Sequence, residues 1–207
     1  MLIMRFRPRD SEEAPDFGLL KGKASASMKS ISAVGTDRVL TYDQQGMLVR
    51  QRRFTDTAIS DDLARDLDID PTGRITITGS TAQNASPEFG IPTPLTLQYD
   101  DSGVLLRTIR AGGEAVDVDT AGAAYLAGTF DTPNASQVAK FDAAGGQVWL
   151  TPLTFADSDI PFIVAIAADT VGQVTVAGIV TNAISLNQDY VTIRYAADGR
   201  ELWRHRF

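Results

Sequence analysis

The side chains of this sequence that could do chemistry are mainly carboxylates and carboxamides. Two acidic stretches, residues 55–62 and 156–159, each follow a phenylalanine. Several carboxylates on one rim could bind a cation, because hard cations take several oxygen ligands, or could hydrogen-bond a sugar. Solvated loop acids without a ligand explain the same pattern. The candidate binding residues are Asp56, Asp61, Asp62, Asn84, Asn134, Asp157, Asp159 and Asn182.

A second acidic pattern, Asp-x-Asp-x-x-Gly, occurs at residues 68–73 and 117–122. Its spacing is similar to the start of a calcium-binding loop, but the later acidic ligands of such a loop are missing. A third copy of the pattern has Ala167 in place of the first Asp. No cofactor is therefore predicted, and calcium is kept as a minority hypothesis.

Nucleophilic catalysis has few candidate residues in this chain. His205 is the only histidine, and there is no cysteine. A Ser–His–acid triad would have to use this one base near the end of the chain, and a metal site built from several histidines is excluded. No catalytic residue is predicted. Hydrolysis by paired carboxylates stays open, because the chain has 26 acidic residues.

Internal repeats must position these side chains. An aromatic residue, usually followed by Asp, two variable positions and Gly, occurs in four copies that begin at Tyr42, Tyr99, Phe141 and Tyr195. A second motif, Asp-x-x-Gly followed by a strand-like segment ending in Gly, occurs three times. Its first glycines lie 49 and 50 residues apart. A constant period of this length indicates a repeat architecture.

Both motifs predict tight turns between antiparallel strands. The Asp side chain accepts hydrogen bonds from the backbone of its own turn, and the Gly can adopt a positive φ. Apolar residues alternate with a period of two on both sides of each turn, as they do in half-buried strands. The residues assigned to turns and tightly packed strand ends are Gly46, Asp70, Gly73, Gly79, Gly103, Asp119, Gly122, Gly128, Gly145, Asp169, Gly172, Gly178 and Gly199.

One repeat is therefore four short antiparallel strands, named a to d in chain order. Repeated four-stranded units of this kind are typical of β-propeller blades, which are stabilised by neighbours on both faces. The sequence predicts an all-β propeller of about four four-stranded antiparallel blades, with a fragment of a larger propeller as the alternative. The blades are residues 1–57, a degenerate first blade, then 58–110, 111–155 and 156–207.

The repeat resembles the bacterial SBBP-type β-propeller repeat. The resemblance rests on residues 169–178 and 189–203, and it extends over about residues 64–207. Ala196 departs from the pattern, because the other copies have Asp there. A weaker kinship exists with quinoprotein-type propeller repeats. The resemblance implies a secreted or cell-surface protein without common catalytic residues. No signal peptide is recognisable in residues 1–30, so the location stays unknown.

Charge and hydropathy limit the classes of partner. The net charge of −7 argues against a nucleic-acid binder, which would present a basic face. No run of 18 apolar residues occurs, so no membrane span is expected. Two arginine-rich stretches, residues 50–53 and 204–206, follow equivalent strands and suit solvated edges. Self-association stays open.

The connections between strands indicate where binding could occur. Up-and-down strands place the a–b and c–d turns at one end of the blades, and the longer b–c and d–a connections at the other. Variable loops on a rigid scaffold often bind ligands. The sequence predicts a non-catalytic binding or scaffold module that presents this loop face to a protein, peptide or glycan. The alternatives are a propeller-type hydrolase or lyase using carboxylates, and a structural part of a larger or oligomeric propeller. The latter predicts an exposed apolar blade flank.

Overall fold

The computed structural model describes residues 30–35, 38–43, 47–53, 60–83, 92–129, 136–155 and 159–207. All regular elements in these ranges are β-strands, and no helix long and apolar enough to cross a membrane occurs among them. The strands are β1 (Ser30–Gly35), β2 (Arg38–Asp43), β3 (Leu48–Arg53), β4 (Ser60–Ile69), β5 (Ile75–Gln83), β6 (Pro92–Tyr99), β7 (Leu105–Ile109), β8 (Ala115–Val118), β9 (Ala124–Thr129), β10 (Ser136–Phe141), β11 (Gln147–Pro152), β12 (Asp159–Ala168), β13 (Val174–Asn182), β14 (Gln188–Tyr195) and β15 (Glu201–Arg206).

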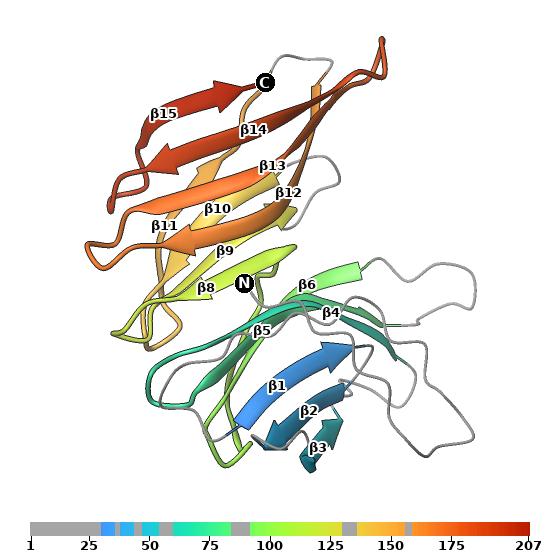
Figure 1. The fold of residues 1–207 in the computed structure, drawn as a ribbon, viewed down its shortest axis with the longest axis vertical. Coiled ribbons are helices and arrows are strands. Elements are labelled where there is room, and N and C mark those ends of the chain that lie inside the picture. The colour runs from blue at the N-terminus through green and yellow to red at the C-terminus, as the bar shows by residue number, and fades with distance from the viewer. Residues whose placement is uncertain are drawn as a thin grey trace.

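The described strands form antiparallel sheets in chain order. The sheets β4–β7, β8–β11 and β12–β15 have four strands each, and β1–β3 has three. Figure 1 shows that the sheets follow one another as a fan, with β12–β15 at one end and β1–β3 at the other. The predicted all-β array of propeller-type blades is confirmed. The first sheet has three strands among the described residues.

The first strands of the sheets line one side of the fan. Contacts run from β1 to β4, from β4 to β8 and from β8 to β12. Strands β4, β8 and β12 are therefore the a strands of their blades. The β2–β3 connection carries the motif that begins at Tyr42, which marks a c–d turn in the other blades. Strands β1, β2 and β3 thus correspond to strands b, c and d.

Each sheet packs through two faces. We call the face toward the preceding sheet the A face and the face toward the following sheet the B face. The largest core cluster lies between the B face of β8–β11 and the A face of β12–β15, because alternate residues of the facing strands are apolar. Fully buried members of this cluster are Tyr125, Ala127, Val138, Val174, Val176, Val180, Ile193 and Tyr195.

The Asp/Gly turns close as their chemistry requires. Oδ1 of Asp70 accepts hydrogen bonds from the backbone N–H groups of Thr72 and Arg74 at 2.8 and 3.0 Å. Gly73 in this turn has a φ of +87°. Ala196 lacks such a carboxylate, yet the backbone bond from the Gly199 N–H to its carbonyl, at 2.9 Å, is kept. The backbone alone therefore tolerates the departure from the repeat pattern.

Glycines of strand b face the backbone of strand a at close range, and Gly79 and Gly178 lie within β5 and β13, not at the strand ends that the sequence predicted. A Cβ atom at Gly79 would clash with the carbonyl oxygen of Leu63, and one at Gly178 would clash with that of Phe162. Strand a has a register shift next to each contact, so its backbone bends toward the glycine. At Gly128, which has a φ of +141°, a Cβ would overlap Glu114.

Candidate interaction surface

The structure describes the side chains of only two of the predicted binding residues. Asp56, Asn84, Asn134 and Asp157 lie outside the described residues. Asp61 and Asp62 belong to strand β4, where their backbones pair with Ala82 and Thr81, although the sequence had suggested a d–a connection. Asp159 and Asn182 likewise begin and end strands, β12 and β13.

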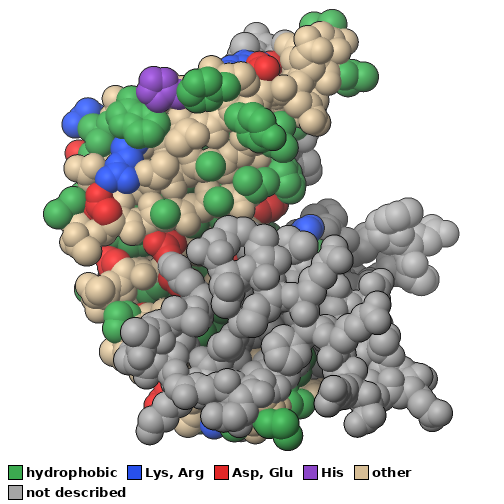
Figure 2. All heavy atoms as spheres, in the orientation of Figure 1, with side chains coloured by type: hydrophobic (Ala, Val, Ile, Leu, Met, Phe, Trp, Pro, Cys, Tyr) green, Lys and Arg blue, Asp and Glu red, His purple; other side chains and the backbone are tan. Residues whose placement is uncertain are grey.

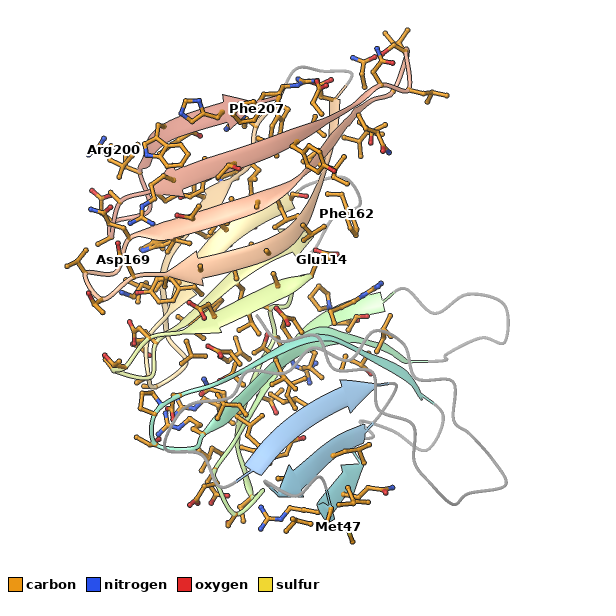
Figure 3. The ribbon with its side chains drawn as sticks, viewed as in Figure 1. Met47, Glu114, Phe162, Asp169, Arg200 and Phe207 are labelled. Carbon is orange, nitrogen blue, oxygen red and sulfur yellow. The ribbon has the colours of Figure 1, made fainter. Side chains whose placement is uncertain are left out.

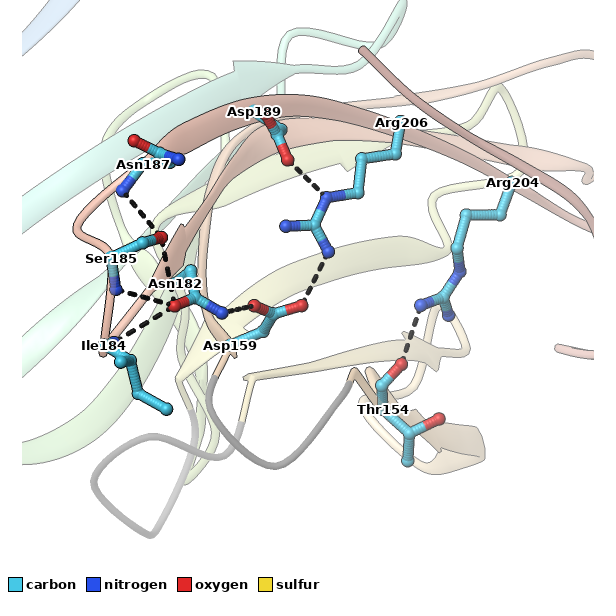
Figure 4. A network of polar contacts seen from close by, with 9 residues as sticks. All are labelled: Thr154, Asp159, Asn182, Ile184, Ser185, Asn187, Asp189, Arg204 and Arg206. Atoms are coloured by element: carbon cyan, nitrogen blue, oxygen red, sulfur yellow. Dashed lines mark hydrogen bonds and ion pairs between the residues drawn. The ribbon is translucent and has the colours of Figure 1, made fainter.

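The structure brings Asp159 and Asn182 together (Figure 4). The Asn182 side-chain amide donates to Oδ1 of Asp159 at 3.1 Å. Arg206 donates from Nη1 to Oδ2 of Asp159 and from Nε to Oδ2 of Asp189, both at 2.6 Å. The hydrogen bond from Arg206 holds the pKa of Asp159 below its usual value. Arg206 thus neutralises the charges of Asp159 and Asp189. The three side chains form a structural clamp and not a cation site.

Asn182 also shapes the end of the β13–β14 hairpin. Its Oδ1 accepts hydrogen bonds from the backbone N–H groups of Ile184 and Ser185 at 3.1 and 2.9 Å. The following Leu186 has a φ of +59°. Ile184 is 84% exposed and Leu186 is 74% exposed, and Figure 1 shows the hairpin extending beyond the rest of its sheet. The tip is therefore an ordered apolar projection.

Buried carboxylates join neighbouring blades. Asp68 in β4 accepts a hydrogen bond from the Val118 N–H at 2.7 Å, and Asp66 accepts one from the Val116 N–H at 3.1 Å. One blade further on, Asp117 accepts one from the Ala168 N–H at 2.7 Å. These residues include the acids that suggested calcium. Their spacing of one repeat was visible in the sequence, but it did not reveal the backbone partners.

The described carboxylates form no metal centre, and those with a resolved pKa shift have a lowered pKa. Within the described ranges, no group of three or more His, Cys, Asp or Glu side chains could hold a metal ion. Hydrogen bonds from Ser102 and Val104 lower the pKa of Asp100. At Asp169 burial acts to raise the pKa, but hydrogen bonds from Gln173, Val171 and Arg194 lower it overall. Neither shift suits a general acid, which needs a raised pKa.

One connection assigned to the loop face is buried instead. The sequence had suggested that Ala111–Glu114, the link between strands β7 and β8, would take part in binding. Ala111, Gly112 and Gly113 are buried. Thr96 donates to the Ala111 carbonyl at 2.7 Å, and the Gly113 N–H donates to Thr78 at 2.9 Å. That assignment is wrong, because the link fills the space between two blades.

The B face of β12–β15 is exposed and rich in apolar side chains. We call it the open flank. Phe162 pairs with Ile179, Ile179 pairs with Tyr190, and the backbones of Tyr190 and Phe207 exchange hydrogen bonds. Phe162, Tyr190 and Phe207 are 54%, 71% and 79% exposed. This row crosses all four strands, and Phe162 and Phe207 are labelled at its ends in Figure 3.

A second group of rings lies along β15 on the same flank. The Trp203 and His205 ring centroids are 5.2 Å apart, and those of His205 and Phe207 are 6.1 Å apart. Figure 2 shows hydrophobic side chains around the single histidine on this face. Arg194 lies on the same side as Trp203, its register partner, and forms an ion pair with Asp169. The flank is thus apolar with a compensated charge.

In the interior of the array, the strand-d residues equivalent to Trp203 contact the next blade. Trp149 donates its indole N–H to the Ala197 carbonyl at 2.9 Å, and a Cβ at Gly199 would come within 2.7 Å of the Trp149 ring. Arg50 donates to the Asp101 carbonyl at 2.9 Å. Ala197 and Asp101 are each the second residue of a four-residue c–d turn. Trp203 has the equivalent position and is 43% exposed.

Fold and surface together define a β-propeller-type repeat array that ends in an open flank. No family model matches the chain, and no curated protein matches it. Similar solved structures include a protein of unknown function from Bacteroides caccae, with 10% identity, a TM-score of 0.46, and coverage of 86% of this chain and 78% of that chain.

Two further structures have named activities. A variant of Synechocystis apocarotenoid oxygenase is 11% identical, with a TM-score of 0.47 and coverage of 86% of this chain and 46% of that chain. A putative gluconolactonase is 13% identical, with a TM-score of 0.48 and coverage of 84% and 58%. This chain spans about half the length of these two proteins. Likeness at this level carries no argument about activity.

Proposed function

We propose that this chain is a non-catalytic propeller scaffold that binds another protein through the open flank. One observation carries the proposal: the flank is equivalent, strand by strand, to faces that are buried between blades elsewhere, yet its aromatic side chains are exposed. A contiguous exposed apolar surface usually marks an interaction site. Tyrosine, tryptophan and phenylalanine are also the side chains enriched at the centres of protein interfaces.

The roles of the described acids support a scaffold over a hydrolase or lyase. Asp66, Asp68 and Asp117 accept backbone hydrogen bonds from the next blade. Asp159 accepts hydrogen bonds from Arg206 and Asn182. A carboxylate that is engaged in this way stabilises the fold and has little freedom to exchange protons with a substrate. The scaffold would act without a cofactor and without nucleic acid.

The loop face and the family belong to the same proposal. Binding of a peptide or glycan by the b–c and d–a connections stays a prediction, because four of its eight candidate residues lie outside the described ranges. The repeat signature supports kinship with the bacterial SBBP-type propellers, and with it a secreted or surface location. Neither point is needed for the docking role of the flank.

Binding of the dye ANS (8-anilinonaphthalene-1-sulfonate) at low protein concentration tests whether the flank is an accessible apolar surface. We expect the folded chain to enhance ANS fluorescence, and Phe162→Ser combined with Tyr190→Ser to remove most of the enhancement. Val171→Ser is the matched control, because Val171 is 68% exposed in a turn of the same sheet. An equal response from all three proteins, with unchanged circular dichroism, would contradict the proposed docking surface.

A further inference from the structure

We propose that a second copy of this chain covers the open flank, and that it docks head to tail through the A face of its β1–β3 sheet. The inference rests on the proposed function and adds the identity of the partner. A B face already pairs with an A face at each junction between consecutive sheets of the described chain, and a second copy would continue this series.

The two ends of the fan carry the two unmatched halves of this pairing. The open flank is the B face of the last sheet. The A face of β1–β3 has no preceding sheet in the described part of the chain. Figure 1 shows the two end sheets far apart in one copy, so one copy cannot bring these faces together in this arrangement. A second copy supplies each missing half.

The A face of β1–β3 has a residue suited to this role. Leu40 pairs with Gln51 in the same register in which Ile193 pairs with Arg204 and Ala139 pairs with Leu150. Ile193 and Ala139 are fully buried on the A faces of their sheets, where they face the preceding blade. Leu40 is only half-buried and Gln51 is exposed. Docking would give Leu40 the environment that its equivalents already have.

Strand d of the open flank also presents an unused contact. Arg50 and Trp149 each donate to the second residue of a c–d turn in the next blade. Trp203 occupies the equivalent position at the exposed end. The β2–β3 connection has the same sequence motif as the receiving turns, an aromatic residue and Asp followed two positions later by Gly. Trp203 therefore offers a second copy a side chain at the position where Arg50 and Trp149 contact the next blade.

The inner part of the flank explains why this contact would be reversible. Asp68 and Asp117 accept hydrogen bonds from the backbone of the next a strand, but Ala167 occupies this position in the last sheet. Docking therefore depends on the aromatic outer part. Two copies in this arrangement would form a closed ring of about eight sheets, which is within the usual range for propellers of roughly four to eight blades, with the same contact used twice.

Sedimentation velocity over a wide concentration range tests the inference. We expect the parent chain to change from monomer to dimer as concentration rises. Phe162→Asp with Tyr190→Asp, the flank variant, and Leu40→Asp, the first-sheet variant, should each weaken self-association at least tenfold. Gln51→Asp, at an exposed position of the same A face, replaces Leu40→Asp if the latter fails to fold. Val171→Asp, outside both faces, should behave as the parent.

Mixing the two variants decides between arrangements. A head-to-tail contact predicts that the flank variant and the first-sheet variant form a heterodimer, because one intact face remains on each. A flank-to-flank contact predicts that mixing restores nothing and that the first-sheet variant dimerises alone, which would overturn the proposal. Larger open-ended oligomers would keep the head-to-tail contact but overturn the closed ring.

A parent chain that stays monomeric at every concentration would also overturn the second copy as partner. If such a monomer still shows the flank-dependent ANS signal, the docking function stands and only the partner is different. If it shows no such signal, other residues of the same chain cover the flank, and both proposals fail. The two experiments together therefore separate the two claims.

Discussion

Two junctions in the array each join one four-stranded sheet to the next. Their geometry is the same, but the side chains on their B faces have opposite polarity. The B face of β4–β7, which packs on β8–β11, is polar, whereas the B face of β8–β11, which packs on β12–β15, is mainly apolar. Buried polar residues of the first face are Asp66, Asp68, Thr76, Thr78, Thr96 and Gln98, and Ile109 is a buried apolar residue of the same face. Buried residues at the same positions of the apolar face include Tyr125, Ala127 and Val138.

Most buried polar groups of the polar junction have partners, although Oε1 of Gln98 has none among the described residues. Gln98 donates to Thr76 at 3.1 Å, and Thr96 contacts Thr78 at 3.2 Å and donates to the Ala111 carbonyl at 2.7 Å. A buried polar group without a partner would cost about 1–3 kcal/mol, so a polar blade face requires such a network. Backbone spacing therefore determines how the blades pack, and the chemistry of the side chains varies within that spacing.

The largest effect is expected where the backbone spacing itself is changed. Gly128→Val should lower the free energy of unfolding by about 4 kcal/mol or more, or prevent folding, because a Cβ there overlaps Glu114 and the φ of +141° strains any other residue. Chemical denaturation measures the loss. Ala144→Val, in an exposed turn of the same sheet, is the control. Equal stability of the Gly128→Val protein and its parent would contradict the blade packing.

The apolar junction should be more sensitive to a cavity than the polar junction is to the loss of a hydroxyl. Ile193→Ala removes a fully buried side chain and should cost about 2–5 kcal/mol. Thr96→Val keeps the shape but removes two hydrogen-bond contacts, and should cost about 1–3 kcal/mol. Urea denaturation of both variants gives the ranking, and a larger loss for Thr96→Val would reverse the comparison.

Asp117 combines the two chemistries, because it is a buried acid on the mainly apolar face. Asp117→Ala should lower the free energy of unfolding by about 1–3 kcal/mol, since the Ala168 N–H loses its acceptor. Asp117→Asn keeps an oxygen acceptor and should lose less. Thermal unfolding compares the two. If both variants are as stable as the parent, or more stable, Asp117 does not stabilise the contact between the two sheets, and a catalytic role regains support.

The smallest effect is expected at the Asp159–Arg206 contact, and it depends on pH. The pKa of Asp159 is lowered in the folded chain. Its stabilising contribution is therefore complete above the ordinary carboxyl value of about 4 and is lost as the pH falls through the lowered value. The difference in Tm between the parent and Asp159→Asn should be constant near neutral pH and shrink below about pH 4. Asp101→Asn, on an exposed turn, is the control, and a pH-independent difference would contradict the clamp.

Local chemistry made the blades predictable from the sequence. The Asp/Gly turns need only residues within one turn, so their spacing revealed four repeats and the strand order. Trp149 and Trp203 recur at the same position of two repeats, and Trp149 contacts the turn of the next blade. The roles of Asp68 and Asp117 were missed, because their partners are backbone groups about one repeat away, which no local pattern specifies.

The position of exposed surface could not be predicted for a similar reason. Burial of Ala111–Gly113 follows from two threonines on other strands, and exposure of the open flank follows from the absence of a covering sheet among the described residues. Both depend on which blades are neighbours. The sequence predicted an apolar flank only as a consequence of the structural alternative, without locating it.

The solvent exposure of Trp203 tests the central claim most directly. In a Trp149→Phe protein, Trp203 is the only tryptophan, so its fluorescence reports on the open flank alone. At high dilution the account predicts red-shifted emission that acrylamide quenches readily, with a blue shift as concentration rises. Blue-shifted, protected emission at every concentration would contradict it, because the flank would then be covered within a single chain.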